Sequence, residues 1–145
     1  MNIDIEKRVE MARQFHRQGF NCAQAVVAAY ADIFDLDEQT ALRISASFGG
    51  GIGMMRQTCG AACGMFMLCG LYCGQTNPDD KQAKMNNYKQ VQNLAQQFKD
   101  INGSLICAEL LGLKEPDDPN TIINKTTCND KVADAATIIG KYLQQ

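Results

Sequence analysis

QTCGAACGMFMLCGLYCG, residues 57–74, is the stretch that decides the fold, because it predicts a buried helix at the centre of the domain. Its apolar part, residues 59–74, sits at or below the roughly 17 residues that a membrane-spanning helix needs. Glycines recur along one side of this predicted helix as two Gly-x-x-x-Gly steps, which favour the close approach of a neighbouring helix. These glycines are Gly60, Gly64, Gly70 and Gly74.

The rest of the chain also reads as helix. Apolar residues recur at helical spacing, strand-like alternation is absent and proline is rare. A chain of 145 residues that is 46% apolar can bury one core. We therefore predict an all-α fold, with a single domain over residues 1–145 and about six or seven helices around the Gly/Cys-rich central helix.

Capping signals mark where these helices begin. Asn21 and Gln24 form a capping box, and Asp37 is the expected cap of the next helix. Further helix starts are predicted at Thr58, at Asn77-Pro78 with Asp79 and Asp80 in the first turn, at Ser104, and at a second capping box of Thr127 and Asp130. Helices are predicted to end at Gly19, at the glycine cluster of residues 48–53 and at Gly103.

The charge and the cysteine count exclude several classes of protein. A net charge of −2 offers no basic surface for nucleic acid or for an anionic membrane. No apolar leader is present, so we expect a cytoplasmic location and cysteines that are mostly free thiols. The single histidine, His16, excludes chemistry that needs two histidines, and its mostly polar helix face predicts an exposed side chain.

Four cysteines share one feature of position. Cys22, Cys59 and Cys128 each follow a predicted cap directly, and Cys107 lies three residues after Ser104. Free backbone N–H groups and the helix dipole stabilise a thiolate in a first turn, so its pKa can fall below about 8.5. Four such positions in one chain predict a site at which helix N-termini converge.

The remaining cysteines of the central helix are predicted to pack in the core. They are Cys63, Cys69 and Cys73. The pairs Cys59/Cys63 and Cys69/Cys73 have i,i+4 spacing, so each could also supply half of a tetrahedral metal site. The segment FGGGIG, residues 48–53, matches no phosphate-loop motif, and we expect it to turn the chain tightly and bring Cys59 close to another backbone.

Five motifs together resemble the bacterial and archaeal C-GCAxxG-C-C family of redox-active proteins. They are GFNCAQAV, FGGGIG, CGAACG, CAELLG and TCND, and they span residues 19–132. The resemblance implies redox or cluster chemistry at Cys22, Cys59, Cys107 and Cys128. The third motif departs from Gly-Cys-Ala-x-x-Gly, so Cys63 is kept as an alternative motif cysteine.

Two classes of function remain open at the level of the sequence. In the first, the four cysteines form one redox site, either as thiol/disulfide pairs or as ligands of an iron–sulfur cluster or another thiolate-bound metal. Such a site would exchange electrons with a redox partner protein or a small thiol. In the second, the chain is a non-catalytic helical binding module that forms a homodimer through the glycine-rich helix.

Overall fold

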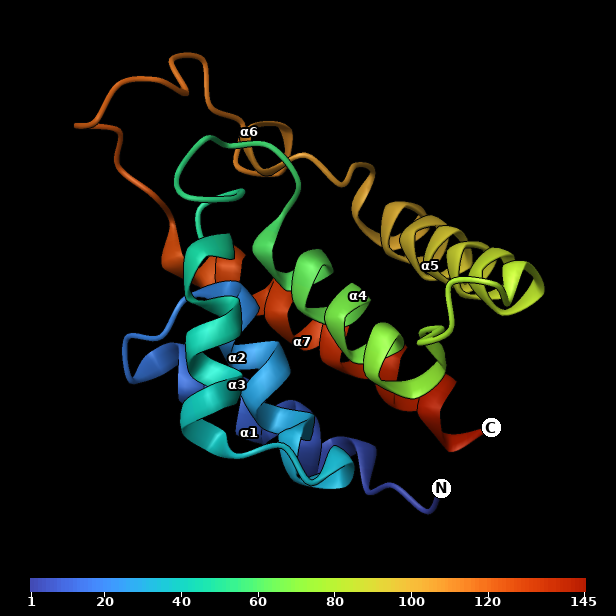
Figure 1. Ribbon diagram of the computed structural model, residues 1–145. Helices are drawn as coiled ribbons and strands as arrows, with labels where there is room; N and C mark the ends of the chain where they lie inside the picture. The colour runs from blue at the N-terminus through green and yellow to red at the C-terminus, as the bar shows by residue number, and fades with distance from the viewer.

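The computed structural model describes residues 1–145, and its regular structure is entirely helical (Figure 1). Two short 3-10 turns accompany the α-helices, and no strand is present. This confirms the prediction of an all-α fold with six or seven helices. The α-helices are α1 (Ile5–Arg17), α2 (Cys22–Tyr30), α3 (Glu38–Ser45), α4 (Gly60–Cys73), α5 (Lys81–Asn102), α6 (Cys107–Leu110) and α7 (Lys125–Gln144).

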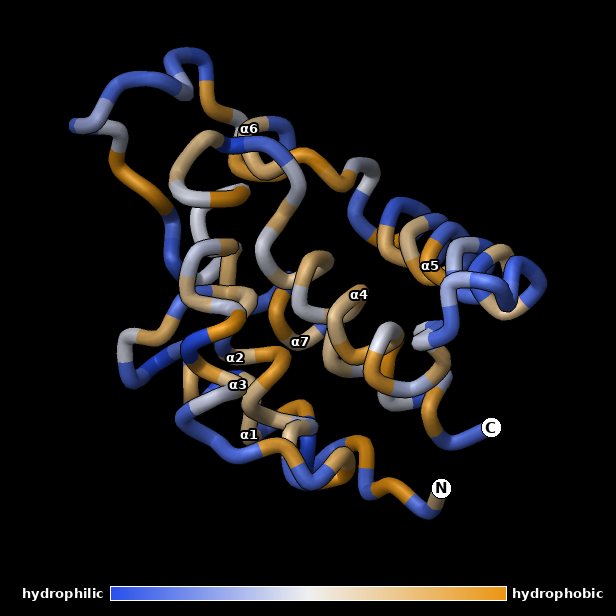
Figure 2. Tube along the Cα trace, viewed as in Figure 1, coloured by the Kyte–Doolittle hydropathy of each residue, from blue (hydrophilic) through white to orange (hydrophobic).

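The glycine- and cysteine-rich helix α4 lies at the centre, as the sequence predicts. It packs against α2, α5 and α7, and most of its first ten residues are buried. In Figure 2, α2 and α4 are hydrophobic along most of their length, whereas α5 carries a broad hydrophilic face. Tyr30 at the end of α2 is fully buried and donates a hydrogen bond of 2.6 Å to the carbonyl oxygen of Ala136 in α7. These contacts join α2, α4 and α7 in one core.

Only the first of the two Gly-x-x-x-Gly steps serves close packing. A Cβ atom added at Gly60 would lie 2.8 Å from the carbonyl oxygen of Phe48, and one at Gly64 would lie 3.0 Å from that of Ala23. Added at Gly70, it would meet nothing within 4 Å, and at Gly74 it would meet α4 itself. The glycine face that was expected to serve a dimer is therefore filled, at its first step, by α2 of the same chain.

The capping signals of the first half of the chain are confirmed. Asn21 accepts a hydrogen bond from the backbone N–H of Gln24, whose side chain bonds back to the N–H of Asn21. Asp37 accepts from the N–H of Thr40. Gly103 ends α5 in the left-handed conformation, with a φ of 85°.

Three predicted helix starts in the second half are wrong, and the one at Ser104 is described with the site below. Helix α5 begins at Lys81 behind Asp80, because the side chain of Asn77 holds the N–H of Asp79 in a turn. Helix α7 begins at Lys125, ahead of the predicted box at Thr127 and Asp130. Asn124 caps α7 by accepting from two backbone N–H groups, and asparagine is a better cap than threonine.

Two further features are a contact between the chain ends and the limited apolar length of the helices. Gln144 donates a hydrogen bond of 3.1 Å to the carbonyl oxygen of Ile3, which holds the two ends of the chain side by side. None of the helices combines the length and the apolar character that crossing a membrane requires.

Replacement of Gly64 by alanine should destabilise the fold. The added methyl group would meet the carbonyl oxygen of Ala23 and the Cβ of Val26 at 3.0 Å, so α2 and α4 must separate. We expect a loss of about 1–3 kcal/mol in the free energy of unfolding, measured by urea denaturation. Gly70→Ala is the matched control, because open space and a helical backbone predict a gain of roughly 0.5–1 kcal/mol. Equal effects at the two positions would contradict the packing account.

Candidate functional site

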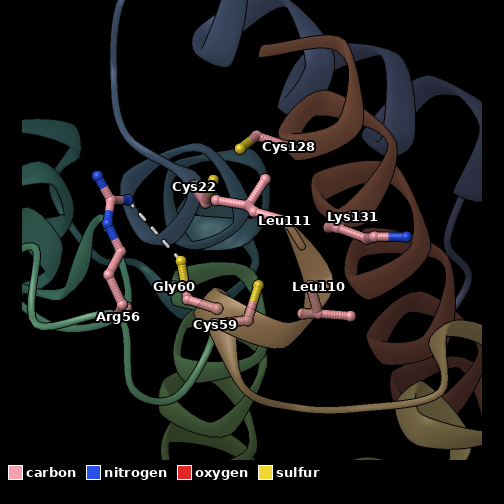
Figure 3. Close-up of a pocket in the computed structure, with 11 residues that line it drawn as sticks. Cys22, Arg56, Cys59, Gly60, Leu110, Leu111, Cys128 and Lys131 are labelled. Atoms are coloured by element: carbon pink, nitrogen blue, oxygen red, sulfur yellow. Dashed lines mark hydrogen bonds between the residues drawn. The ribbon is translucent and has the colours of Figure 1, made fainter. Parts of the chain in front are cut away.

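One cavity is lined by all four of the cysteines that the sequence singles out. Cys22, Cys59, Cys107 and Cys128 stand on its wall, and its volume is about 40 Å³ (Figure 3). We call it the four-cysteine cavity. Each cysteine comes from the N-terminal end of a different helix, so α2, α4, α6 and α7 meet there.

The position of Cys22 directly after its cap is as predicted, and the positions of the other three cysteines in their helices differ from the prediction. Cys22 is the first residue of α2 and Cys107 is the first residue of α6. Cys59 is itself the N-cap residue of α4, so Thr58 does not cap this helix. Cys128 is the fourth residue of α7, because α7 begins earlier than predicted.

Ser104 does not cap α6 either. The cap position belongs to Ile106, and the hydroxyl oxygen of Ser104 accepts the N–H of Ile106 at 2.9 Å. Ser104 is not at the cap position because residues 105–107 are extended and pair with the chain just before α4. Thr58 and Ile106 form an isolated antiparallel bridge.

This bridge places Cys59 and Cys107 on two extended segments that lie side by side. The N–H of Cys59 donates to the carbonyl oxygen of Leu105 at 2.7 Å, and the N–H of Cys107 donates to that of Gln57 at 2.6 Å. Short backbone hydrogen bonds on both sides fix the two cysteines relative to each other. Backbone hydrogen bonds therefore hold the N-terminal ends of α4 and α6 together at this wall of the cavity.

Gly50 and Gly51 of the glycine cluster also line the cavity, and the cluster turns the chain tightly, as expected. Gly50 and Gly51 both have positive φ, at 65° and 69°. A Cβ atom at Gly51 would lie only 2.6 Å from the Cβ of Cys107. Cys107 is thus the cysteine that packs against this turn, and Cys59 lies close to another backbone, that of Leu105, as expected.

Arg56 brings a positive charge to the cavity that the sequence analysis missed. Its side chain is buried, with 8% of its surface exposed, and Nη1 donates to the sulfur of Cys107 at 3.9 Å (Figure 3). It takes part in none of the three salt bridges of the molecule. The signal in the sequence was that Arg56 is the one charged residue between Phe48 and Gly74.

A buried guanidinium without a carboxylate needs another negative group nearby, because an isolated charge is costly to bury. Lys131 also lines the cavity, but its ammonium donates to the side chain of Asn102 at 2.7 Å and turns away from the sulfurs (Figure 3). The one hydrogen bond that the guanidinium of Arg56 makes goes to the sulfur of Cys107. The arrangement therefore favours a thiolate in the cavity.

Cys128 is the cysteine whose acidity the cavity increases. A hydrogen bond from the thiol of Cys22 lowers the pKa of Cys128 to about 7, and the charges of Arg56 and Lys131 act in the same direction against burial. The same hydrogen bond, followed by burial and the charge of Cys128, raises the pKa of Cys22. The pair therefore consists of one thiolate and one thiol near neutral pH.

The other two cysteines are not acidified. Burial raises the pKa of Cys59 to about 11, although the N–H groups of Ala62 and Ala61 oppose it. Burial also raises the pKa of Cys107 against the hydrogen bond from Arg56. The expectation that all four helix starts lower the thiol pKa is therefore wrong for every cysteine except Cys128. Burial outweighs the helix N-terminus at Cys59 and Cys107, and the hydrogen bond with Cys128 is the largest cause at Cys22.

His16 lies beside the site, and the prediction that its side chain is exposed is wrong. It is half-buried, and its Nε2 lies 3.9 Å from the sulfur of Cys22. Its Nδ1 lies 3.1 Å from Nδ2 of Asn129, one residue after Cys128. The expectation of a surface histidine failed because the contact joins α1 to α7, at opposite ends of the sequence.

The proton on His16 can be placed from its neighbours. Oδ1 of Asn129 accepts from the guanidinium of Arg13 at 2.5 Å, and Nδ2 of Asn129 donates to the carbonyl oxygen of Arg13 at 3.3 Å. A flipped amide would lose both bonds, so Nδ2 donates to Nδ1 of His16 and leaves the ring proton on Nε2. Burial, then Lys125, lowers the pKa of His16, so the ring is neutral at pH 7 and its N–H faces the sulfur of Cys22.

The four thiols have the chemistry, but not the spacing, for a single metal ion. Four cysteines can hold tetrahedral zinc or an iron–sulfur cluster. No three cysteine, histidine, aspartate or glutamate side chains come together in a way that could hold one ion. The residues of the cavity therefore do not fit a mononuclear metal in this arrangement.

The other three cysteines lie outside the cavity. Cys63 is buried in α4, and its thiol donates to the carbonyl oxygen of Thr58 at 3.8 Å. Cys69 is buried and Cys73 is half-buried near the C-terminal end of α4. All seven cysteines are free thiols.

Comparison with known protein families gives one match that covers most of the chain. The profile of the C_GCAxxG_C_C family, described as "Putative redox-active protein", matches residues 20–142. The chain belongs to this family. The matched range contains all four cysteines of the cavity. Comparisons with curated proteins and with solved structures give no match.

Replacement of Cys22 by alanine should make Cys128 less acidic, because it removes the hydrogen bond that contributes most to the low pKa. We expect the pKa of Cys128 to rise from about 7 toward the ordinary 8.5, and its rate of alkylation by iodoacetamide at pH 7 to fall about tenfold. Peptide mass spectrometry across pH measures both. Cys63→Ala is the control and should leave the profile of Cys128 unchanged. An unchanged profile in the Cys22 variant would contradict the pairing.

Proposed function

We propose that this member of the family is a thiol–disulfide redox protein in which Cys128 attacks and Cys22 resolves. The observation that supports this most directly is that Cys22 and Cys128 line a single cavity. The pKa of Cys128 is lowered there, whereas that of Cys22 is raised. A thiolate with a pKa near the ambient pH is the most effective attacking group in disulfide exchange. Cys128 meets this condition with a pKa of about 7.

The reaction transfers two electrons from the protein to a small disulfide. The Cys128 thiolate attacks one sulfur of the external disulfide, a new S–S bond forms, and the other half leaves as a thiolate that takes up a proton. Cys22 then loses its proton and attacks the sulfur of Cys128, which releases the second half as a thiol. The products are a Cys22–Cys128 disulfide and two small thiols, and the reverse sequence reduces the protein.

His16 has a defined role in the second step. Once Cys128 is bonded to the external sulfur, it can no longer accept the proton of Cys22. The N–H of His16 then stabilises the thiolate that Cys22 must become, since hydrogen bonds to charged acceptors are stronger than those to neutral ones. Asn129 and Arg13 hold the ring in the required tautomer.

Cys59 and Cys107 form the second pair of the proposed site. Their pKa values are raised, so they remain thiols while Cys128 reacts. The hydrogen bond from Arg56 opposes this rise at Cys107. Cys107 then loses its proton, attacks the Cys22–Cys128 disulfide at Cys128 and expels Cys22, which takes up the proton. Cys59 then displaces Cys128, and the oxidation passes to a Cys59–Cys107 disulfide with no net change in electrons.

A trapping experiment with oxidised glutathione tests the order of attack. In Cys22→Ser/Cys107→Ser, which lacks both cysteines that attack Cys128 in this scheme, glutathione should remain attached to Cys128 as a stable mixed disulfide, detected by intact and peptide mass spectrometry. The unaltered protein should instead lose two hydrogens and carry no glutathione. Cys63→Ser is the matched control and should behave as the unaltered protein. The proposal fails if Cys128→Ser is oxidised as fast as the unaltered protein.

Replacement of His16 by leucine should slow the second step alone. The variant keeps Cys128 and its partner, so attachment of glutathione proceeds at the normal rate. Release of glutathione by Cys22 should slow about tenfold, as expected for the loss of a hydrogen bond to a charged sulfur. Rapid-quench mass spectrometry separates the two rates. A slowed first step with a normal second step would contradict the assigned role.

The iron–sulfur alternative gives a different result in one measurement. Protein purified without oxygen would contain iron and acid-labile sulfide in stoichiometric amounts, and Cys128→Ser would lose both. The thiol–disulfide proposal predicts neither iron nor sulfide and full reversible oxidation. Stoichiometric iron and sulfide would overturn it.

A further inference from the structure

A second group of sulfur atoms lies far from the four-cysteine cavity, where the C-terminal ends of α4 and α7 lie side by side (Figure 1). The sulfurs of Cys69 and Cys73 are 3.8 Å apart on successive turns of α4. The hydroxyl of Tyr142, from α7, is 3.6 Å from the sulfur of Cys73. Nδ2 of Asn87, from α5, is 3.2 Å from the same sulfur. Three helices thus place polar atoms around two thiols.

The spacing of the two sulfurs is that of neighbouring ligands on a tetrahedral ion. With Zn–S bonds near 2.3 Å, sulfurs 3.8 Å apart subtend an angle of about 111° at the metal. An oxygen 3.6 Å from Cys73, with a Zn–O bond near 2.1 Å, subtends about 110°. Both angles are close to tetrahedral, without any movement of the helices.

Tyr142 supplies the third donor in the absence of a third cysteine, histidine, aspartate or glutamate. Its hydroxyl lies 3.6 Å from the sulfur of Cys73, which is itself 3.8 Å from the sulfur of Cys69. Its ring packs edge-on against Tyr72, with centroids 5.4 Å apart, which fixes the direction of the hydroxyl. Two thiols and one phenol therefore face a common point.

Asn87 occupies the position of an outer-shell partner. Its Nδ2 donates to the sulfur of Cys73 at 3.2 Å and to that of Cys69 at 3.8 Å. N–H groups that donate to sulfur favour the thiolate form, and such partners orient and tune metal ligands. Asparagine in this position would be of little use to two thiols that served only to fill the core.

We propose that Cys69, Cys73 and Tyr142 bind one thiophilic divalent cation of the zinc type, with water at the fourth position. Cys73, Tyr142 and Asn87 are half-buried, which leaves a route of entry from solvent. Burial and the adjacent thiol raise the pKa of Cys69 to about 12, so a cation that binds there displaces the proton of Cys69. This site is independent of the redox proposal, because it shares no residue with the four-cysteine cavity.

Equilibrium dialysis of the reduced protein against zinc, followed by metal analysis, tests the site. The double variant Cys69→Ala/Cys73→Ala should bind one equivalent less than the unaltered protein, whereas Cys63→Ala should bind the same amount. Cobalt in place of zinc should give a thiolate-to-metal charge-transfer absorption that the double variant lacks. Equal metal content in the double variant and the unaltered protein, including none in either, would overturn the proposal.

Two further variants keep the test decisive. Tyr142→Phe preserves the core and should weaken zinc binding about 10–100-fold, the range found when a supporting group of a metal site is removed. Unchanged affinity in this variant would refute the three-donor site. Zinc bound at the four-cysteine cavity would persist in the double variant and disappear in Cys128→Ala. A failure of the zinc-site proposal would therefore say nothing about the reactivity of Cys128.

Discussion

The close contact between α2 and α4 at Gly60 and Gly64 is the constraint on which the rest of the structure depends. A Cβ atom at Gly60 would meet the N–H of Ala23 at 3.2 Å and the Cβ of Cys22 at 3.4 Å. Because no side chain stands between the helices here, their N-terminal ends meet, and Cys22 lies beside Cys59. A larger residue would separate the two cysteines as well as the two helices.

The buried charge of Arg56 then determines the chemistry of the cavity. A guanidinium out of contact with carboxylates is stable only if another group carries negative charge. The most acidic group on the cavity wall is Cys128. We infer that the charge of Arg56 adds to the effect of Cys22 in stabilising the Cys128 thiolate of the reduced protein. The pKa values of the other three cysteines are raised, chiefly by burial at Cys59 and Cys107 and by the pairing with Cys128 at Cys22.

Local signals in the sequence predicted the helices and placed four cysteines near their starts, because capping depends on residues three or four positions apart. The capping box at Asn21 is of this kind. Three features of the structure could not be predicted from such local signals. Arg56 and Ile52 have positive φ, which depends on how the loop packs. His16 meets Asn129 across the whole domain. The direction of each pKa shift depends on burial, which only the packed structure defines.

The measurement that tests the central claim most directly is the thiolate absorbance of the reduced, metal-free protein in the ultraviolet as a function of pH. The account predicts that a first thiolate forms with a pKa of about 7 and is absent from Cys128→Ala. It predicts further that Arg56→Gln moves this step to higher pH. Thiolates that appear only above the ordinary cysteine pKa of about 8.5 in the unaltered protein would contradict the account.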